Sequence, residues 1–166
     1  MEQKIKTNIG LVDYCRKQLG RPYWYGTFGQ RATAALFANR KKTYPRYYTA
    51  SDFPTQYGHK VHDCIGLVKG YMWTDDADST HYTYQDYGFK DMSADMCYNH
   101  CTRKGADMSK MPDIPGVLVF MKGHVGVYAG NGEVIEARGH KFGVVVTKLK
   151  ERPWKRWALL DEIQYL

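Results

Sequence analysis

Long hydrophobic runs are absent from this sequence of 166 residues. No stretch reaches the roughly 18 consecutive apolar residues that a membrane-spanning helix needs, so we expect no membrane span. The first seven residues, Met-Glu-Gln-Lys-Ile-Lys-Thr, hold no apolar segment long enough for a signal peptide. We expect either a protein that is cytoplasmic when made, or one that leaves by another route, such as release by phage lysis or as part of a larger secreted protein.

Cysteine is also sparse, and its spacing does not form a disulfide framework. The four cysteines are Cys15, Cys64, Cys97 and Cys101. Asp75, Asp76 and Asp78 lack EF-hand spacing and a closing glutamate, which favours a solvated turn over a calcium site. A cluster of Cys97, His100 and Cys101 lacks an evident fourth ligand for zinc. We therefore predict no metal and no other cofactor.

The composition favours one domain over residues 1–166, because 43% of the residues are hydrophobic and can form a substantial core. The net charge of +7 suits an anionic partner such as nucleic acid, a membrane surface or an anionic cell-wall polymer. Basic residues are scattered apart from Arg40-Lys41-Lys42, so no nucleic-acid patch is predicted. The fourteen tyrosines fit either a groove for a sugar or peptide polymer or ordinary packing.

The order of patterns along the chain predicts an α+β fold, with N-terminal helices packed on a C-terminal antiparallel sheet. Apolar spacing predicts helices at 8–19, 64–73 and 93–104. Alternating and β-branched runs predict strands at 117–121, 124–129, 133–137, 142–149 and 157–160. Between the first two helices, residues 27–62 read as a long loop insertion, with a short helix near 32–38.

The clearest candidate for chemistry is Cys64, at the predicted start of the second helix. Asp63 is a suitable N-cap, which would place Cys64 in the first helical turn. Free backbone N–H groups and the positive end of the helix dipole favour a thiolate there, and a thiolate is a nucleophile. Taken alone, a cysteine at this position is more often a small hydrophobe that begins a core helix.

A nucleophilic cysteine needs a base and a group that orients the base. Of six histidines, only His124 begins a predicted strand, although it could be a strand-edge histidine facing water. Glu136 stands among apolar neighbours on the next strand. A two-residue Asn131-Gly132 turn would pair 127 with 136 and separate the two side chains. A three-residue loop, 130–132, would pair 126 with 136 and bring them together, and we favour it.

Four motifs resemble the NlpC/p60 family of bacterial and phage cell-wall peptidases, which have a papain-like fold. They are Gly20-Arg21-Pro22-Tyr23-Trp24-Tyr25-Gly26, Asp63-Cys64-Ile65-Gly66-Leu67-Val68, Pro115-Gly116-Val117-Leu118-Val119-Phe120 and Gly123-His124-Val125-Gly126-Val127-Tyr128. The resemblance extends from about Val12 to Leu160, with the motifs in the same order. It implies a nucleophile at Cys64, a base at His124, an orienting residue at Glu136 and a site-lining tyrosine at Tyr23.

Three positions depart from the family pattern. Ile65 replaces the usual serine, although the backbone N–H that helps to hold an oxyanion is retained. Glu136 stands where histidine is most common. The connection between Tyr23 and Cys64, which leads through the insertion to Asp63, is longer than usual, so the substrate preference of other members need not apply.

The resemblance implies a peptidoglycan hydrolase that cuts stem-peptide amide bonds, often next to D-glutamate, and acts at the bacterial cell wall. Such a domain could be the catalytic part of a phage or prophage endolysin. Two alternatives stay open. One is a CHAP-like N-acetylmuramoyl-L-alanine amidase, which shares the order cysteine, histidine, then glutamate or asparagine. The other is a catalytically silent module that binds the cell wall.

Overall fold

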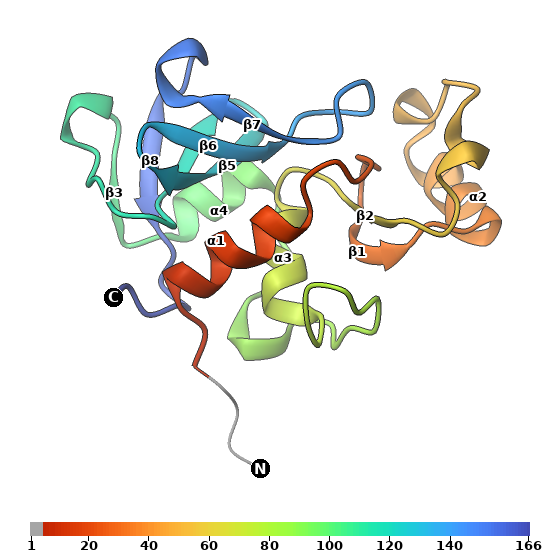
Figure 1. Cartoon of the computed structure of the whole chain (residues 1–166), viewed down its shortest axis with the longest axis horizontal. Helices are drawn as coiled ribbons and strands as arrows, with labels where there is room; N and C mark the ends of the chain where they lie inside the picture. Colours follow the sequence, from red (N-terminus) through yellow and green to blue (C-terminus); the bar gives the residue numbers. More distant parts are fainter. Residues whose placement is uncertain (1–4) are drawn as a thin grey trace.

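A six-stranded antiparallel sheet forms the C-terminal half of the computed structural model, which describes residues 5–166 (Figure 1). Its spatial order is β3-β8-β4-β5-β6-β7. The strands are β3 (Arg103–Gly105), β4 (Leu118–Met121), β5 (His124–Gly130), β6 (Glu133–Ala137), β7 (Val144–Lys148) and β8 (Arg156–Leu159). The helices are α1 (Asn8–Lys17), α3 (Gly66–Trp73) and α4 (Ala94–His100), with α2 described below. The predicted α+β fold is therefore confirmed.

Both faces of the sheet are buried, because alternating side chains of its strands pack into two different hydrophobic clusters. Leu118, Phe120 and Val127 face the main core, which α1, α3 and α4 cover. Val119 and Val134 point to the opposite face, where Trp154 covers them. The central strands can therefore be almost continuously apolar. No helix within residues 5–166 combines the length and hydrophobicity needed to cross a membrane.

Helix boundaries follow local capping and differ from the prediction at two C-termini. The side chain of Thr7 caps α1 by accepting from the N–H of Gly10 at 3.0 Å. The helix ends at Lys17, and Leu19, predicted on its apolar face, is 38% exposed. Helix α4 ends at His100 because residues 103–105 pair with β8 as strand β3. That strand was predicted as the end of a helix, and pairing with β8 overrides the helical pattern.

The β5–β6 hairpin has the predicted register but reaches it through a different turn. Asn131 and Gly132 both have left-handed backbones, with φ of 54° and 74°, as a two-residue type I′ turn requires. Gly130 therefore pairs with Glu133. A bulge at residue 129 then shifts the register by one, so that Val127 lies opposite Ile135. The prediction of a three-residue loop was wrong, whereas the predicted pairing of 126 with 136 follows from the bulge.

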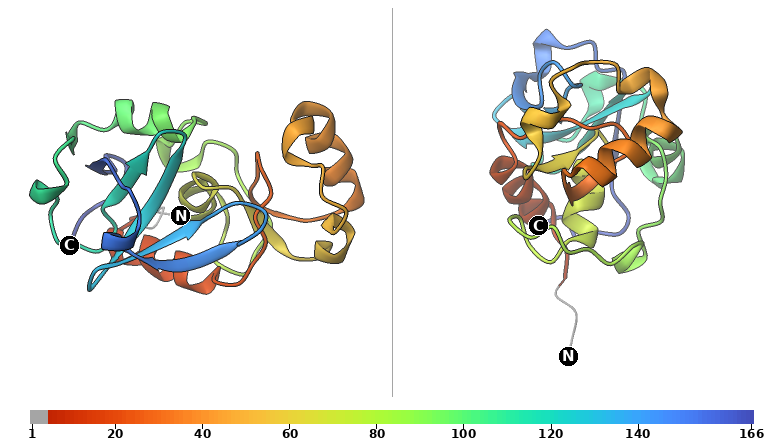
Figure 2. Two further views of the ribbon diagram at one scale, coloured as in Figure 1. Left: turned by 90° about the horizontal axis from the view of Figure 1, so that it is seen from above. Right: turned by 90° about the vertical axis from the view of Figure 1, so that its right-hand side faces the viewer.

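Residues 28–59 form a small lobe beside the sheet domain rather than the predicted irregular loop (Figures 1 and 2). The lobe contains β1 (Phe28–Arg31), α2 (Ala34–Thr43) and the 3₁₀ turns 45–47 and 53–56. Strand β2 (Lys60–His62) follows and pairs with β1. The lobe has a separate buried cluster, in which Ala32, Tyr48 and Phe53 pack with Trp24 and Val61 from the flanking segments. The predicted helix near 32–38 exists but begins at Ala34 and extends to Thr43.

Candidate active site

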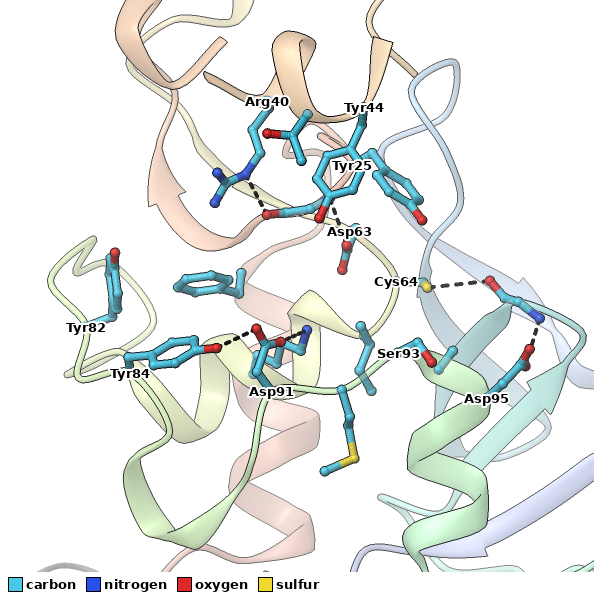
Figure 3. Close-up of a pocket in the computed structure, with 18 residues that line it drawn as sticks. Tyr25, Arg40, Tyr44, Asp63, Cys64, Tyr82, Tyr84, Asp91, Ser93 and Asp95 are labelled. Atoms are coloured by element: carbon cyan, nitrogen blue, oxygen red, sulfur yellow. Dashed lines mark hydrogen bonds and ion pairs between the residues drawn. The ribbon is translucent and has the colours of Figure 1, made fainter. Parts of the chain in front are cut away.

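A cavity of about 780 Å³ opens between the lobe, the start of α3 and the segment that leads into α4 (Figure 3). Cys64, Asp63 and Ile65 line its floor. Lobe residues, including Arg40 and Tyr44, form one wall. The opposite side carries the sequence from Asp91 to Asp95, together with Gly123. The cavity therefore brings together segments that are far apart in the sequence around a single thiol.

Asp63 fixes the backbone that carries Cys64. Its Oδ1 accepts from the N–H of Gly66, the first residue of α3, at 2.7 Å, although the N-cap position is Ile65 and not Asp63 as predicted. Its Oδ2 accepts from the N–H of Gly26 at 2.9 Å and so connects this turn to the chain that enters the lobe. Because α3 begins at Gly66, Cys64 lies in the turn just before the helix rather than inside it. The carboxylate of Asp63 therefore holds the backbone of the cavity floor in place.

The thiol of Cys64 lies against the backbone at the start of β5. Its Sγ is 4.0 Å from the carbonyl oxygen of Gly123, the residue before His124. Burial and the negative charge of Asp63 raise the pKa of Cys64 to about 12, although the N–H groups of Val125 and Ile65 oppose the rise. The structure therefore does not support the lowered pKa that was predicted for Cys64. A thiolate at neutral pH requires that its proton move to a nearby base.

His124 and Glu136 lie together, as the register predicts. The imidazole Nε2 is 2.8 Å from Oε1 of Glu136, whose side chain is completely buried. This contact occupies one ring nitrogen and fixes the plane of the ring. The other nitrogen, Nδ1, has no hydrogen-bond partner within residues 5–166 and is available to a thiol or a substrate. The ring also stacks on Trp154, with centroids 5.5 Å apart and an interplanar angle of 15°.

Glu136 is held by more donors than the sequence indicated. Arg152 donates from Nε to Oε2 at 3.1 Å and from Nη2 to Oε1 at 2.7 Å. The hydroxyl of Thr147 donates to Oε2 at 2.5 Å. Burial alone would raise the pKa of Glu136, but the contacts with His124, Arg152 and Thr147 outweigh it and lower the pKa to about 2. Glu136 is therefore a carboxylate at all ordinary pH values.

The structure places the remaining predicted site residues unequally. Ile65 is buried and lines the cavity. Tyr23 does not line the cavity, but it lies close to Asp63 and Cys64, which form the cavity floor. Burial raises the pKa of Tyr23, and the nearby Asp63 and Cys64 add to that rise. Tyr23 therefore supports the segment that carries the thiol rather than facing the open cavity.

Several polar groups of the site were not predicted. In the cavity, Lys69 pairs with Asp91 at 2.6 Å, and Tyr84 donates to the same carboxylate at 2.6 Å (Figure 3). Arg40 donates to the carbonyl of Gly26 at 2.8 Å. One signal could have indicated Arg152: a glutamate predicted on a buried face needs a cationic partner. The sequence alone could not choose among the many basic residues.

Comparison with known proteins assigns the family. The sequence model of the NlpC/P60 family matches residues 20–162, which is most of the chain. This chain belongs to the NlpC/P60 family. The match covers the Cys64, His124 and Glu136 positions and also the lobe. A search of curated protein sequences gave no significant match.

Solved NlpC/P60 structures have the same fold at low sequence identity. NlpC2 from Trichomonas vaginalis has a TM-score of 0.56 and 16% identity, over 96% of this chain and 48% of that one. The peptidoglycan hydrolase RipB from Mycobacterium tuberculosis has a TM-score of 0.51 and 19% identity, over 95% and 66%. RipD from the same organism is described as a non-catalytic NlpC/p60 domain protein adapted to peptidoglycan binding. Its TM-score is 0.51 and its sequence identity is 17%, over 95% of this chain and 98% of RipD.

The chain spans about half the length of NlpC2 and about two thirds of RipB. At these identities the likeness concerns the fold. Among NlpC/P60 structures, both a hydrolase and a non-catalytic binding protein share it. Family membership therefore points to peptidoglycan, and the arrangement of the site residues must decide between the two roles.

Proposed function

We propose that this protein is a peptidoglycan hydrolase that cleaves an amide bond of the stem peptide by a thiol mechanism. Cys64 is the nucleophile, His124 the base and Glu136 the residue that orients the base. The observation that carries the proposal is the contact of His124 with the buried Glu136 at 2.8 Å, directly after Gly123, whose carbonyl meets the thiol of Cys64 at the floor of an open cavity. A protein that only bound the wall would have no need of this arrangement.

The chemistry follows from the available atoms. The proton of Cys64 moves to Nδ1 of His124, and the sulfur attacks the amide carbonyl carbon to form a C–S bond. The carbonyl oxygen takes the negative charge near the N–H groups of Cys64 and Ile65, which precede the helical hydrogen-bonding pattern of α3. His124 then protonates the leaving amine as the C–N bond breaks, which leaves a thioester. Water, deprotonated by His124, attacks the thioester and regenerates the thiol.

The bond that we propose is one within the stem peptide, next to D-glutamate, which makes the protein an endopeptidase. The CHAP-like amidase activity is the alternative, with cleavage between muramic acid and L-alanine. The same thiol chemistry serves both. The protein would reach the wall by release during phage lysis, as an endolysin, or as part of a larger secreted protein.

A digest of purified peptidoglycan tests the proposal. Mass spectrometry of the soluble fragments should show new termini within the stem, whereas a free lactyl-linked muramic acid would identify an amidase. Cys64→Ala should abolish release, with an unchanged circular dichroism spectrum. Cys101→Ala, a buried cysteine outside the cavity, is the matched control and should retain activity per folded molecule. Release by Cys64→Ala at the wild-type rate would rule out the thiol mechanism.

Metal dependence separates this mechanism from metal-assisted hydrolysis. No group of three or more His, Cys, Asp or Glu side chains within residues 5–166 is arranged to hold a metal ion. EDTA should therefore leave the rate unchanged. Loss of activity in EDTA, restored by zinc, would contradict the proposed mechanism.

We also propose that the lobe contacts an anionic wall polymer. Residues 28–59 include five lysines and arginines but only one acidic residue, Asp52. His140 of the β6–β7 connection engages that carboxylate at 2.6 Å. Most of the basic side chains are exposed, namely Arg31, Lys41, Lys42 and Arg46. The lobe therefore presents a net positive surface next to the cavity, which favours a polyanion.

A further inference from the structure

Arg152 lies outside every motif that marks the family resemblance, yet it makes the most extensive contact with Glu136. It follows the 3₁₀ turn 149–151 and precedes β8. Its guanidinium donates to both carboxylate oxygens, at 2.7 and 3.1 Å, and its side chain is 18% exposed. A two-point contact of this kind fixes both the position and the plane of a carboxylate.

The two contacts of Oε1 connect Arg152 to His124. The same oxygen meets Nη2 of Arg152 at 2.7 Å and Nε2 of His124 at 2.8 Å. Arg152 also lies over the indole ring of Trp154, 5.7 Å from its centroid, and the other partner of that ring is the imidazole. Arg152 thus supports His124 along two routes, one through a carboxylate and one through an aromatic ring.

The charges along this route decide how His124 behaves. A lone buried carboxylate next to an imidazole would favour the imidazolium strongly and hold its proton. The guanidinium offsets part of that charge, so the pull of the carboxylate on the imidazole proton is reduced. A base that must take a proton from Cys64 and later give it to an amine works best when it binds that proton moderately.

We propose that Arg152 is a positioning residue that acts through Glu136. It holds the carboxylate against Nε2 of His124, and its charge offsets that of Glu136, so that His124 can both accept and release a proton. The rate effects of this inference rest on the proposed thiol mechanism. Its effect on the titration of His124 does not.

The other charged or titratable groups of this region surround the contact between Cys64 and Gly123, the residue before His124. They are Cys64 and Asp63 before α3, Tyr23 behind them, and Asp95 of α4, which accepts from the N–H of Gly123 at 2.9 Å. None of these groups contacts Glu136 or Arg152, so variants of that pair leave them in place.

A histidine titration by NMR tests the charge balance without any substrate. The measurements are made in a Cys64→Ala background, so that His124 titrates without the thiol, and the His124 signal is identified by its loss in His124→Gln. Arg152→Gln should raise the midpoint of His124 by about one pH unit or more, because the carboxylate is no longer offset. Glu136→Gln should lower it, because the guanidinium then acts alone. The double variant should return close to the Cys64→Ala value.

Rates in the otherwise wild-type protein test the positioning role. Arg152→Gln should lower kcat by 10-fold or more with little change in KM, and Arg152→Lys should lose less, because it keeps the charge. If Arg152 acts through Glu136, its loss should cost little more once Glu136→Gln is present. Arg156→Gln, which removes an exposed arginine on β8, is the control and should match the wild type in rate and titration.

The outcomes separate this inference from the proposed function. An unchanged His124 midpoint in Arg152→Gln, or a rate loss that simply adds to that of Glu136→Gln, would overturn the role of Arg152. Arg152→Gln alone could fail to fold because it leaves the buried Glu136 carboxylate unpaired. In that case Glu136→Gln is compared with the double variant Glu136→Gln, Arg152→Gln, since neither of these proteins contains that carboxylate. Shifted midpoints in a protein that releases nothing from peptidoglycan would support this inference and refute the hydrolase.

Discussion

At the scale of single residues, the carboxylate of Glu136 gives the most direct test of how His124 is held. Glu136→Gln keeps the shape of the side chain and removes its charge. We expect kcat to fall by roughly 10- to 1000-fold, because charge-assisted hydrogen bonds are worth about 1.5–3 kcal/mol and more in a site without water. The acidic limb of the pH–rate profile should also move, because the substitution removes a negative charge next to the imidazole.

Glu133→Gln is a matched control for this substitution. Glu133 lies on the same strand, β6, but is partly exposed and stands outside the site. Its replacement should change stability by no more than about 0.5 kcal/mol and leave the rate and the pH profile unaltered. A rate and profile in Glu136→Gln equal to those of Glu133→Gln would show that the contact with His124 has no part in the reaction.

The low pKa of Glu136 also predicts how stability depends on pH. Its pKa falls from 4.5 in the unfolded chain to about 2 in the folded protein, so the folded state binds this proton less readily. The resulting stabilisation is present above pH 4.5, declines as pH falls toward 2, and amounts to about 3 kcal/mol. The unfolding free energy measured in urea should fall more steeply over this pH range for the wild type than for Glu136→Gln. Parallel pH curves for the two proteins would contradict the assignment.

At the scale of elements, Gly126 in β5 lets Trp154 approach the strand next to His124. A Cβ atom on Gly126 would lie 2.6 Å from Val134 and 2.9 Å from the indole of Trp154. Gly126→Ala should therefore displace Trp154, lower the unfolding free energy by about 1–3 kcal/mol and reduce kcat by disturbing the ring that stacks on His124. Urea unfolding and the rate per folded molecule measure the two effects. Wild-type values for both would show that the strand relaxes at no cost.

The elements themselves were largely predictable, because strands 117–121, 124–129 and 133–137 alternate or run apolar within short segments bounded by turns. The register that joins His124 to Glu136 was predicted through the wrong loop. A bulge at residue 129 leaves no mark in the sequence, because any small residue can occupy it. The predicted pairing was nevertheless correct, because a two-residue turn followed by a one-residue bulge gives the same register as a three-residue loop.

Contacts between distant segments were less predictable. Strand β3 has the sequence Arg-Lys-Gly, which has no β pattern, and it forms because β8 offers a free edge. The role of Arg152 depends on where the turn at 149–151 directs the chain. The fold of the lobe depends on aromatic side chains such as Trp24 and Phe53, whose spacing follows neither helical nor strand period. These features arise from tertiary packing and not from local propensity.

At the scale of the whole molecule, the charge of the lobe should govern attachment to the wall without affecting the chemistry. The triple variant Lys41→Glu, Lys42→Glu and Arg46→Glu should bind intact cell walls less tightly, because it reverses exposed charges on the lobe. Cleavage of a small soluble stem peptide should remain as in the wild type. Sedimentation with cell walls over a range of salt concentrations measures the first effect, and the difference should shrink as salt rises.

A second triple variant, in Lys17, Lys110 and Lys148, controls for net charge. These lysines are exposed and lie outside the lobe, on α1, the 3₁₀ turn 108–110 and β7. Their replacement by glutamate changes the total charge by the same amount. Equal loss of wall binding in the two triple variants would mean that total charge, and not the lobe, attaches the protein.

The pairing at the base of the lobe makes it a unit that could be removed or exchanged. Arg31 and Lys60 lie opposite each other in the β1–β2 pair, so the chain leaves the base and returns to it at neighbouring points. An Asn-Gly turn could join them in place of residues 32–59, with polar replacements at Trp24 and Val61, which would lose their cover. The shortened protein would keep its thiol and histidine, but its cavity would lack the wall that the lobe forms. Grafting the lobe onto a relative that lacks it would then show whether substrate choice is inherited with this one segment.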